Sequence, residues 1–224
     1  MRAILAYTVA RLRVRRGRVL LAAGGIAAAG AMLGASVTVA YGLATGFDRT
    51  AARSQLPDIL ATFQPVPRAG VARVVSSLAN VRAASYRLQV GHVYLAAGER
   101  FESDATVIGR PRGGLRGYAL VGGRDVERPG EVVIEQGLAQ AWHLRPGAQV
   151  DLGGTELRVV GIAVAPDSVA FPLARGPRLW LRYREAALVT GIPAGSVNSV
   201  LIWLANPSLE DVTLAQARSA SLGI

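Results

Sequence analysis

The run from Val19 to Phe47 constrains this chain more than any other feature, because it contains no charged side chain. A helix needs roughly 20 consecutive apolar residues to cross the hydrocarbon core of a bilayer, and this run is long enough with some tilt. Tyr41 and Phe47 lie near its far end, where aromatic side chains favour the membrane interface. We therefore predict one transmembrane helix over residues 19–47.

The charge that precedes this run predicts its orientation. The chain has a net charge of +10, and residues 1–47 hold six arginines and no acidic residue. Positive residues beside a span stay on the cytoplasmic side, so we expect a cytoplasmic N-terminus and an extracytoplasmic segment 48–224 at the plasma membrane. The clustering indicates contact with the lipid bilayer rather than with nucleic acid. The arginines expected at the membrane interface are Arg11, Arg13, Arg15, Arg16 and Arg18.

The first 18 residues have the pattern of an amphipathic helix. Ile4, Leu5, Val9 and Leu12 recur at helical spacing, and arginines can occupy the opposite face. This pattern predicts a segment 1–18 that lies in the cytoplasmic interface against lipid headgroups. A disordered basic tail is the alternative.

The predicted span is rich in alanine and glycine, and Gly30 and Gly34 form a GxxxG spacing. Small residues let transmembrane helices approach closely, so these glycines are candidate helix-packing positions. The alternative is that an alanine-rich genome supplies them. A cleaved signal peptide is a further interpretation, but its apolar region would be about 7–15 residues long. In either case residues 48–224 are exported.

Beyond the span, the hydrophobic pattern changes to short alternating runs separated by Gly and Pro turns. Gly153-Gly154 suits the tight turn of a hairpin, and Ser208 with Asp211 indicates the start of a helix. The pattern predicts an α+β domain with a mixed, mainly antiparallel sheet and a few amphipathic helices. The expected helices are 68–79, 136–142 and 208–222, and the main strands are 84–95, 101–108, 118–121, 132–134, 149–152, 156–165, 179–182 and 197–204.

The sequence lacks the residue patterns of a catalytic or metal site. It has no cysteine and only two histidines, His92 and His143. No Walker A, HExxH or GxSxG pattern is present, so we predict neither an enzyme nor a cofactor. We interpret the closely spaced Glu127, Glu131 and Glu135 as solvated loop and strand residues. We interpret the basic patch of Arg110, Arg112 and Arg116 as a solvated, mobile loop, with binding of anionic lipid or an acidic partner as the alternative.

Residues 122–164 carry the most distinctive text of the chain, GGRDVERPGEVVIEQGLAQAWHLRPGAQVDLGGTELRVVGIAV. A strand precedes a short helix, then a Leu-x-Pro-Gly turn and a hairpin that ends in Val-Val-Gly-Ile. This block resembles the extracytoplasmic core domain of FtsX-like, MacB-type ABC transporter permeases. The order of a basic start, one span and a large outer domain is similar to that family as well, and assigns 48–224 to a MacB-like core domain.

The resemblance implies a permease subunit, or the N-terminal part of one, in an export or mechanotransmission complex. In that family a cytoplasmic ABC ATPase is the partner, and the outer domain couples its motion to an extracytoplasmic substrate or partner. Family members carry three more transmembrane helices, whereas this sequence stops at Ile224 without a second span. We therefore expect either a truncated gene or fragment, or further helices supplied by another polypeptide or a second permease copy. A single-pass anchored binding module without a transport role is the alternative function.

Overall fold

The computed structural model of the chain describes residues 27, 28, 30–32, 34–36, 38, 53–167 and 169–221. Contacts divide the chain into an N-terminal unit, Met1–Arg49, and a larger unit, Thr50–Ile224. The described residues of the N-terminal unit are helical. Within it, the Ser36 hydroxyl donates to the carbonyl oxygen of Met32, and Thr38 to that of Gly34, each at 2.8 Å. The helix therefore satisfies the polar atoms of both hydroxyls internally.

None of the helices in the described ranges combines the length and the apolar character that a membrane crossing requires. Most of the predicted span, residues 19–47, and all of the predicted interfacial segment, residues 1–18, lie outside the described residues. Both therefore stay predictions.

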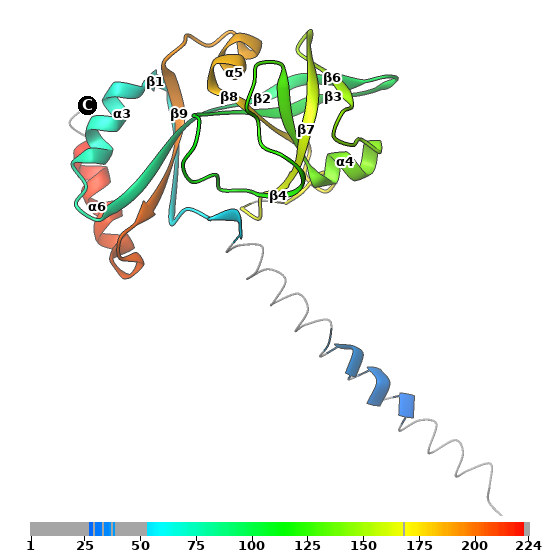
Figure 1. Ribbon diagram of the computed structural model, residues 1–224. Coiled ribbons are helices and arrows are strands. Elements are labelled where there is room, and N and C mark those ends of the chain that lie inside the picture. Colours follow the sequence, from blue (N-terminus) through cyan, green and yellow to red (C-terminus); the bar gives the residue numbers. More distant parts are fainter. Residues whose placement is uncertain are drawn as a thin grey trace, which may run out of the picture. The chain divides into compact units, whose positions relative to one another are not determined.

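The larger unit consists of strands joined by short helices (Figure 1). Its elements in chain order are β1 (Ile59–Pro67), α3 (Arg68–Ser76), β2 (Val81–Ala97), β3 (Arg100–Arg110), β4 (Ala119–Gly123), β5 (Glu131–Glu135), α4 (Gln136–Trp142), β6 (Gln149–Leu152), β7 (Thr155–Val164), β8 (Arg178–Arg182), α5 (Tyr183–Thr190), β9 (Ser196–Leu204), the 3-10 turn η1 (Pro207–Leu209) and α6 (Glu210–Ser221). Two of the strand pairs, β3 with β8 and β5 with β7, are parallel and the rest are antiparallel. The prediction of a mixed, mainly antiparallel α+β domain is confirmed for this unit.

Part of the sheet closes on itself. The pairings run from β2 through β3, β8, β5 and β7 to β6, which pairs again with β2. We call this ring of strands, with α4 and α5, the barrel. Its interior is filled by alternate residues of each strand, such as Val132 and Ile134 of β5 and Leu179 and Leu181 of β8, all fully buried. Alternation with period two is what places one face of every strand inside a small barrel.

β4 pairs with β7 beside the ring, whereas β1 and β9 form a second, smaller sheet with the first half of β2. β9 pairs with β1 on one side and with Val81–Arg87 of β2 on the other. Figure 1 shows α3 (cyan) and α6 (red) next to one another beside β9. Val75 of α3 and Leu214 of α6 pack against Ile202 and neighbouring residues of this sheet. We call β1, β9, the first half of β2, α3 and α6 the sheet lobe.

β2 belongs to both parts of the domain. Its first half, Val81–Arg87, pairs with β9, and its second half, from Leu88, pairs with β3. The strand continues through a register shift between Val90 and Val93, where His92 has a φ of 58°. One uninterrupted strand therefore joins the sheet lobe to the barrel.

The structure corrects three sequence-based predictions. Strand β1 was not expected, because Pro65 and Pro67 indicate a boundary between elements rather than a strand. The prolines are tolerated in β1 since it lies at the end of the sheet order, where a missing N–H breaks no ladder hydrogen bond. Helix α5 was also missed. The predicted helix 208–222 is confirmed as α6, but it begins at Glu210, because the side chain of Asn206 accepts the Ser208 N–H at 3.1 Å and a 3-10 turn comes first.

Candidate functional site

The sequence predicted two sets of site residues, both in the N-terminal unit. Gly30 and Gly34 are helical, and a methyl group added to either would meet no described atom within 4 Å. Helix packing at these glycines stays a prediction. The arginines expected at the membrane interface, Arg11, Arg13, Arg15, Arg16 and Arg18, lie outside the described residues.

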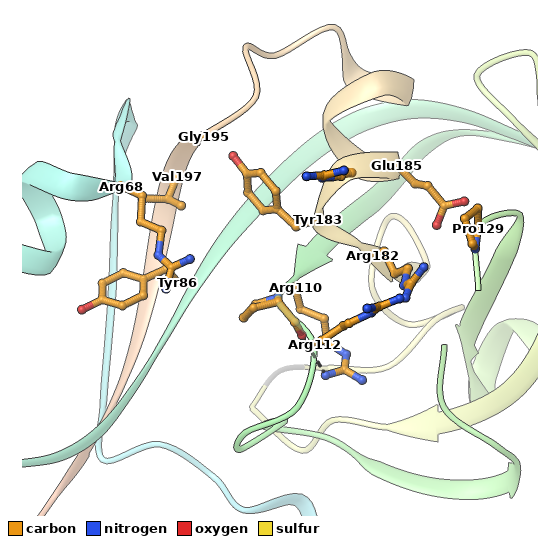
Figure 2. A pocket seen from close by; sticks show the side chains of 12 residues that line it. Arg68, Tyr86, Arg110, Arg112, Pro129, Arg182, Tyr183, Glu185, Gly195 and Val197 are labelled. Atoms are coloured by element: carbon orange, nitrogen blue, oxygen red, sulfur yellow. Dashed lines mark hydrogen bonds between the residues drawn. The ribbon is translucent and has the colours of Figure 1, made fainter. Parts of the chain in front are cut away.

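A cavity of about 570 Å³ lies where the sheet lobe meets the barrel. Arg68 at the start of α3, Tyr86 of β2 and Val197 of β9 line it from the sheet lobe. Arg110 at the end of β3 and Glu185 of α5 line it from the barrel. Figure 2 shows Arg68 and Tyr86 on one side of the cavity and Arg182 and Glu185 on the other. The volume is within the range of small-molecule sites.

The lining of this cavity is strongly basic. Five arginines line it, Arg68, Arg110, Arg112, Arg182 and Arg184, with Glu185 as the one carboxylate. Among the described residues, only Arg110 of these five forms an ion pair. The guanidinium of Arg68 lies over the ring of Tyr86, 5.0 Å from its centroid. The cavity therefore holds more cationic charge than its own carboxylate can balance.

Three polar atoms of the lining residues are buried without a partner in the described part of the chain. They are Nε of Arg110, Nη2 of Arg182 and Oε2 of Glu185. The other carboxylate oxygen of Glu185 accepts the N–H of Gly130. Burial raises the pKa of Glu185; the charge of Glu131 adds to this rise, and the bond from Gly130 opposes it.

Arg110 lines the cavity and is held in place by a cluster of hydrogen bonds and ion pairs. It is only 7% exposed and pairs with Asp125, which also accepts the hydroxyl of Tyr118 at 2.7 Å and Nε of Arg116 at 3.3 Å. Burial favours a raised pKa for Asp125, but the bonds from Tyr118 and Arg110 outweigh it and leave the pKa lowered. This cluster holds the segment after β3 against Trp180, whose ring centroid lies 4.8 Å from that of Tyr118.

A second buried cluster lies around Arg178 at the start of β8. Its guanidinium donates to Glu135 at 2.9 Å, to Asp167 at 2.6 Å and to the carbonyl oxygen of Ala165 at 2.9 Å. Burial acts to lower the pKa of Arg178, but its bonds and charge pairing with Glu135 and Asp167 raise it overall. Because its charge is paired with these two carboxylates, we assign Arg178 a structural role.

Two interpretations from the sequence are wrong in part. Glu131 and Glu135 are buried, at 7% and 2% exposure, and only Glu127 of that set is exposed. The basic patch also divides, because Arg110 is buried in β3 whereas Arg112 is exposed at the cavity. Both incorrect interpretations have the same cause. Charged residues next to Pro and Gly turns are expected to be exposed to solvent, and the sequence does not show the partners that allow them to be buried.

Three of the cavity arginines, Arg68, Arg182 and Arg184, had no signal in the sequence that marked them. They stand at the ends of elements, Arg68 and Arg184 in the first turns of α3 and α5 and Arg182 at the end of β8, where arginine is common on any surface. Among the residues that the structure describes, no three His, Cys, Asp or Glu side chains are arranged to hold a metal ion. His92 instead contacts Asp104 at 2.6 Å, and His143 ends α4 in the left-handed conformation.

Comparison with known proteins identifies the fold. The sequence matches the MacB-like periplasmic core domain family over residues 19–220. No curated protein matches it significantly. The structure is similar to the extracellular domain of the ABC-type transporter YknZ from Gram-positive bacteria, with a TM-score of 0.53 and 12% identity over 70% of this chain and 88% of that one.

A second solved structure agrees. The periplasmic region of MacB from Actinobacillus actinomycetemcomitans matches with a TM-score of 0.53 and 14% identity, over 73% of this chain and 83% of that one. At such identities the two structures establish the fold, while the family match covers nine-tenths of the sequence, residues 19–220 of 224. The chain therefore belongs to the MacB-like periplasmic core domain family of ABC transporter permeases.

Proposed function

We propose that this chain is a permease subunit, or the N-terminal part of one, of an ABC-type export or mechanotransmission complex. A cytoplasmic ATPase supplies the motion, and the outer domain passes it to an extracytoplasmic substrate or partner. Membership of the MacB-like family supports this function. The basic residues before the apolar run of 19–47 support an N-terminus on the ATPase side of the plasma membrane.

The segment through which the chain enters the outer domain is bound to the sheet lobe, and this observation carries the proposal. β1, its first strand, and α6, its last helix, both belong to the sheet lobe. The chain that enters the lobe is fixed to β9: the Trp203 indole donates to the carbonyl oxygen of Gln55 at 2.9 Å, and Asp58 accepts the N–H of Leu204 at 2.7 Å. A displacement of the preceding helix would thus act directly on the sheet lobe.

From the sheet lobe, the displacement has a stiff route to the barrel. β2 is hydrogen-bonded along its first half to β9 and along its second half to β3. A strand that is paired over most of its length transmits a displacement along its axis. Sliding of β2 against its neighbours would break the hydrogen bonds of the sheet. The barrel, with its buried core, would then move together with the sheet lobe.

In the membrane, we propose that the 19–47 helix packs against other spans, from a second permease copy or from another polypeptide. The small residues Gly30 and Gly34 supply the close-approach face. ATP binding and hydrolysis belong to the partner subunit in this scheme.

Affinity purification tests the proposal. The full chain, tagged at its C-terminus and expressed in its native host, is extracted in mild detergent beside a signal-peptide fusion of residues 50–224. We expect mass spectrometry to find an ABC ATPase subunit with the full chain and not with the fusion. If the full chain recovers no ATPase while the fusion alone retains an extracytoplasmic ligand, the anchored binding module is the correct function.

A further inference from the structure

We propose that the cavity between the sheet lobe and the barrel is a binding site for an organic phosphate that carries at least two negative charges. Five arginines from three different segments of the chain converge on this cavity. Four of them, Arg68, Arg112, Arg182 and Arg184, have no ion-pair partner among the described residues. The inference concerns ligand binding and does not depend on coupling to an ATPase.

The unsatisfied atoms of the lining favour an anion. A buried donor without a partner is unfavourable, and so is the approach of several like charges. Nη2 of Arg182 and Nε of Arg110 are buried and have no partner in the described structure, and Arg110 is 93% buried by its 7% exposure. A bound anion would reduce the repulsion between these guanidinium groups and supply the counter-charge that the described residues do not.

The charge and shape of the lining indicate a phosphate. Four unpaired cations face one carboxylate, Glu185, so a single carboxylate ligand would leave most of the charge unbalanced. The forked guanidinium matches phosphate oxygens with paired hydrogen bonds. Helix α5 also begins at the cavity with no side chain capping its first N–H groups, and phosphate oxygens accept from such groups.

Rings among the lining residues suit the organic part of the ligand. They belong to Tyr86, Tyr183, Pro111 and Pro129. The Arg68 guanidinium is already stacked on Tyr86 at 5.0 Å, which leaves its edge to donate into the cavity. A phosphorylated headgroup of a membrane lipid and a soluble organic phosphate share this chemistry, and the experiment below separates the two sources.

Isothermal titration of the full chain in detergent provides the test. The probes are pyrophosphate, dihexanoyl phosphatidic acid, dihexanoyl phosphatidylcholine and glutarate. We expect pyrophosphate and phosphatidic acid to bind, and phosphatidylcholine and glutarate to bind at least about tenfold more weakly. Tighter binding of phosphatidic acid than of pyrophosphate assigns the site to a lipid headgroup; the reverse order assigns it to a soluble phosphate.

Paired variants connect binding to the cavity. Arg112→Gln with Arg182→Gln removes two of the free cations, and we expect it to weaken phosphate binding by about tenfold or more. Arg145→Gln with Arg158→Gln removes the same charge from exposed positions outside the lining and should leave the affinity within about twofold. Arg182→Lys keeps the charge but loses the fork, so an intermediate loss is expected.

Two results would overturn the proposal. One is the absence of binding by both phosphate probes to the unmodified chain. The other is an equal loss of affinity in the cavity pair and the control pair, which would mean that net charge alone attracts the probe. Circular dichroism melting of each variant shows whether it is folded, and Arg112→Gln alone, at an exposed position, repeats the test if the pair is not.

Discussion

Arg178 and Glu135 form a doubly hydrogen-bonded pair in the interior of the domain. The Arg178 guanidinium donates to one carboxylate oxygen at 2.9 Å and its backbone N–H donates to the other at 3.0 Å. Glu135 is 2% exposed and ends β5, while Arg178 begins β8. The pair therefore fixes the ends of two barrel strands with charges that are almost completely buried.

Removal of one partner should be far more harmful than removal of both. Arg178→Ala leaves the Glu135 charge buried and should destabilise the domain by roughly 3–5 kcal/mol. The double variant Glu135→Leu with Arg178→Met replaces the pair with apolar groups and should recover most of that loss. Thermal melting of the full chain in detergent gives the comparison. Arg158→Ala, at an exposed position of β7, is the control. Equal melting temperatures for the single and double variants would contradict this account.

Glu131 should make stability depend on pH in the acid range. Hydrogen bonds from Arg124 lower the pKa of Glu131 to about 2; burial opposes this, and the N–H groups of Glu127 and Arg128, each at 2.9 Å, assist it. Because the folded pKa is below that of the unfolded chain, the contribution is fully present above the unfolded value and is lost as pH falls toward the folded one.

The measurement is the melting temperature of the unmodified chain and of Glu131→Gln between pH 7 and pH 2. We expect a constant difference down to about pH 5 that narrows as the pH falls further. Glu156→Gln, exposed on β7, should show no such narrowing. A difference that is unchanged at pH 2.5 would mean that Glu131 does not stabilise the fold through its charge.

Asp125 should control the mobility of the segment between β3 and β4. It binds Arg110, Arg116 and Tyr118, which all precede it in the chain. Asp125→Ala removes these bonds and should expose the segment, so that trypsin cleaves after Arg112 and Arg116 faster. Mass spectrometry of a digestion time course identifies the sites, with Glu156→Ala as the control. An unchanged cleavage rate would show that packing of Tyr118 on Trp180 is sufficient to hold the segment.

Two glycines should respond to alanine with opposite signs. A methyl group at Gly137 would overlap the carbonyl oxygen of Phe171, so Gly137→Ala should destabilise the domain by about 1–3 kcal/mol. Gly70 lies within α3 with open space around its Cα, so Gly70→Ala should stabilise by about 0.5–1 kcal/mol. Melting temperatures measure both changes. A stabilised Gly137→Ala would show that the segment of Phe171 moves freely away from α4.

The proposed helix packing makes a prediction about assembly. Gly30→Leu with Gly34→Leu should reduce recovery of the partner subunits, because larger side chains separate the helix backbones. Ala31→Leu with Ala35→Leu adds similar bulk at the same spacing on a face rotated along the helix, and should have less effect. Quantitative mass spectrometry of the purified complex compares the two pairs. A stronger effect of the alanine pair would place the contact on that other face.

The sequence predicted most barrel strands because their residues are apolar at local, period-two spacing. Val132–Ile134 and the hairpin around Gly153-Gly154 are clear cases, and both were found close to the predicted positions. β1 was missed since its prolines are tolerated only at a sheet edge, and position in a sheet is not a local property. Helix α5 was missed although it is longer than α4, which the sequence predicted.

The candidate site was much less predictable than the fold. Its arginines come from α3, the end of β3 and the start of α5, and only the crossing of β2 between two sheets brings these segments together. The same holds for Glu135 and Arg178, whose pairing depends on the contact of β5 with β8. Charged residues lack the periodicity that marks a core, so their partners follow from topology alone.

The shared strand also links the cavity to the internal motion of the domain. Its walls come from both parts of the domain, and β2 is the element common to them. A change in the twist of β2 would therefore be expected to alter the width of the cavity. A ligand that fits one width better stabilises the matching angle between the two parts, and a fixed angle changes the ligand's affinity by the same factor. Occupancy of the cavity would then report the mechanical state of the subunit.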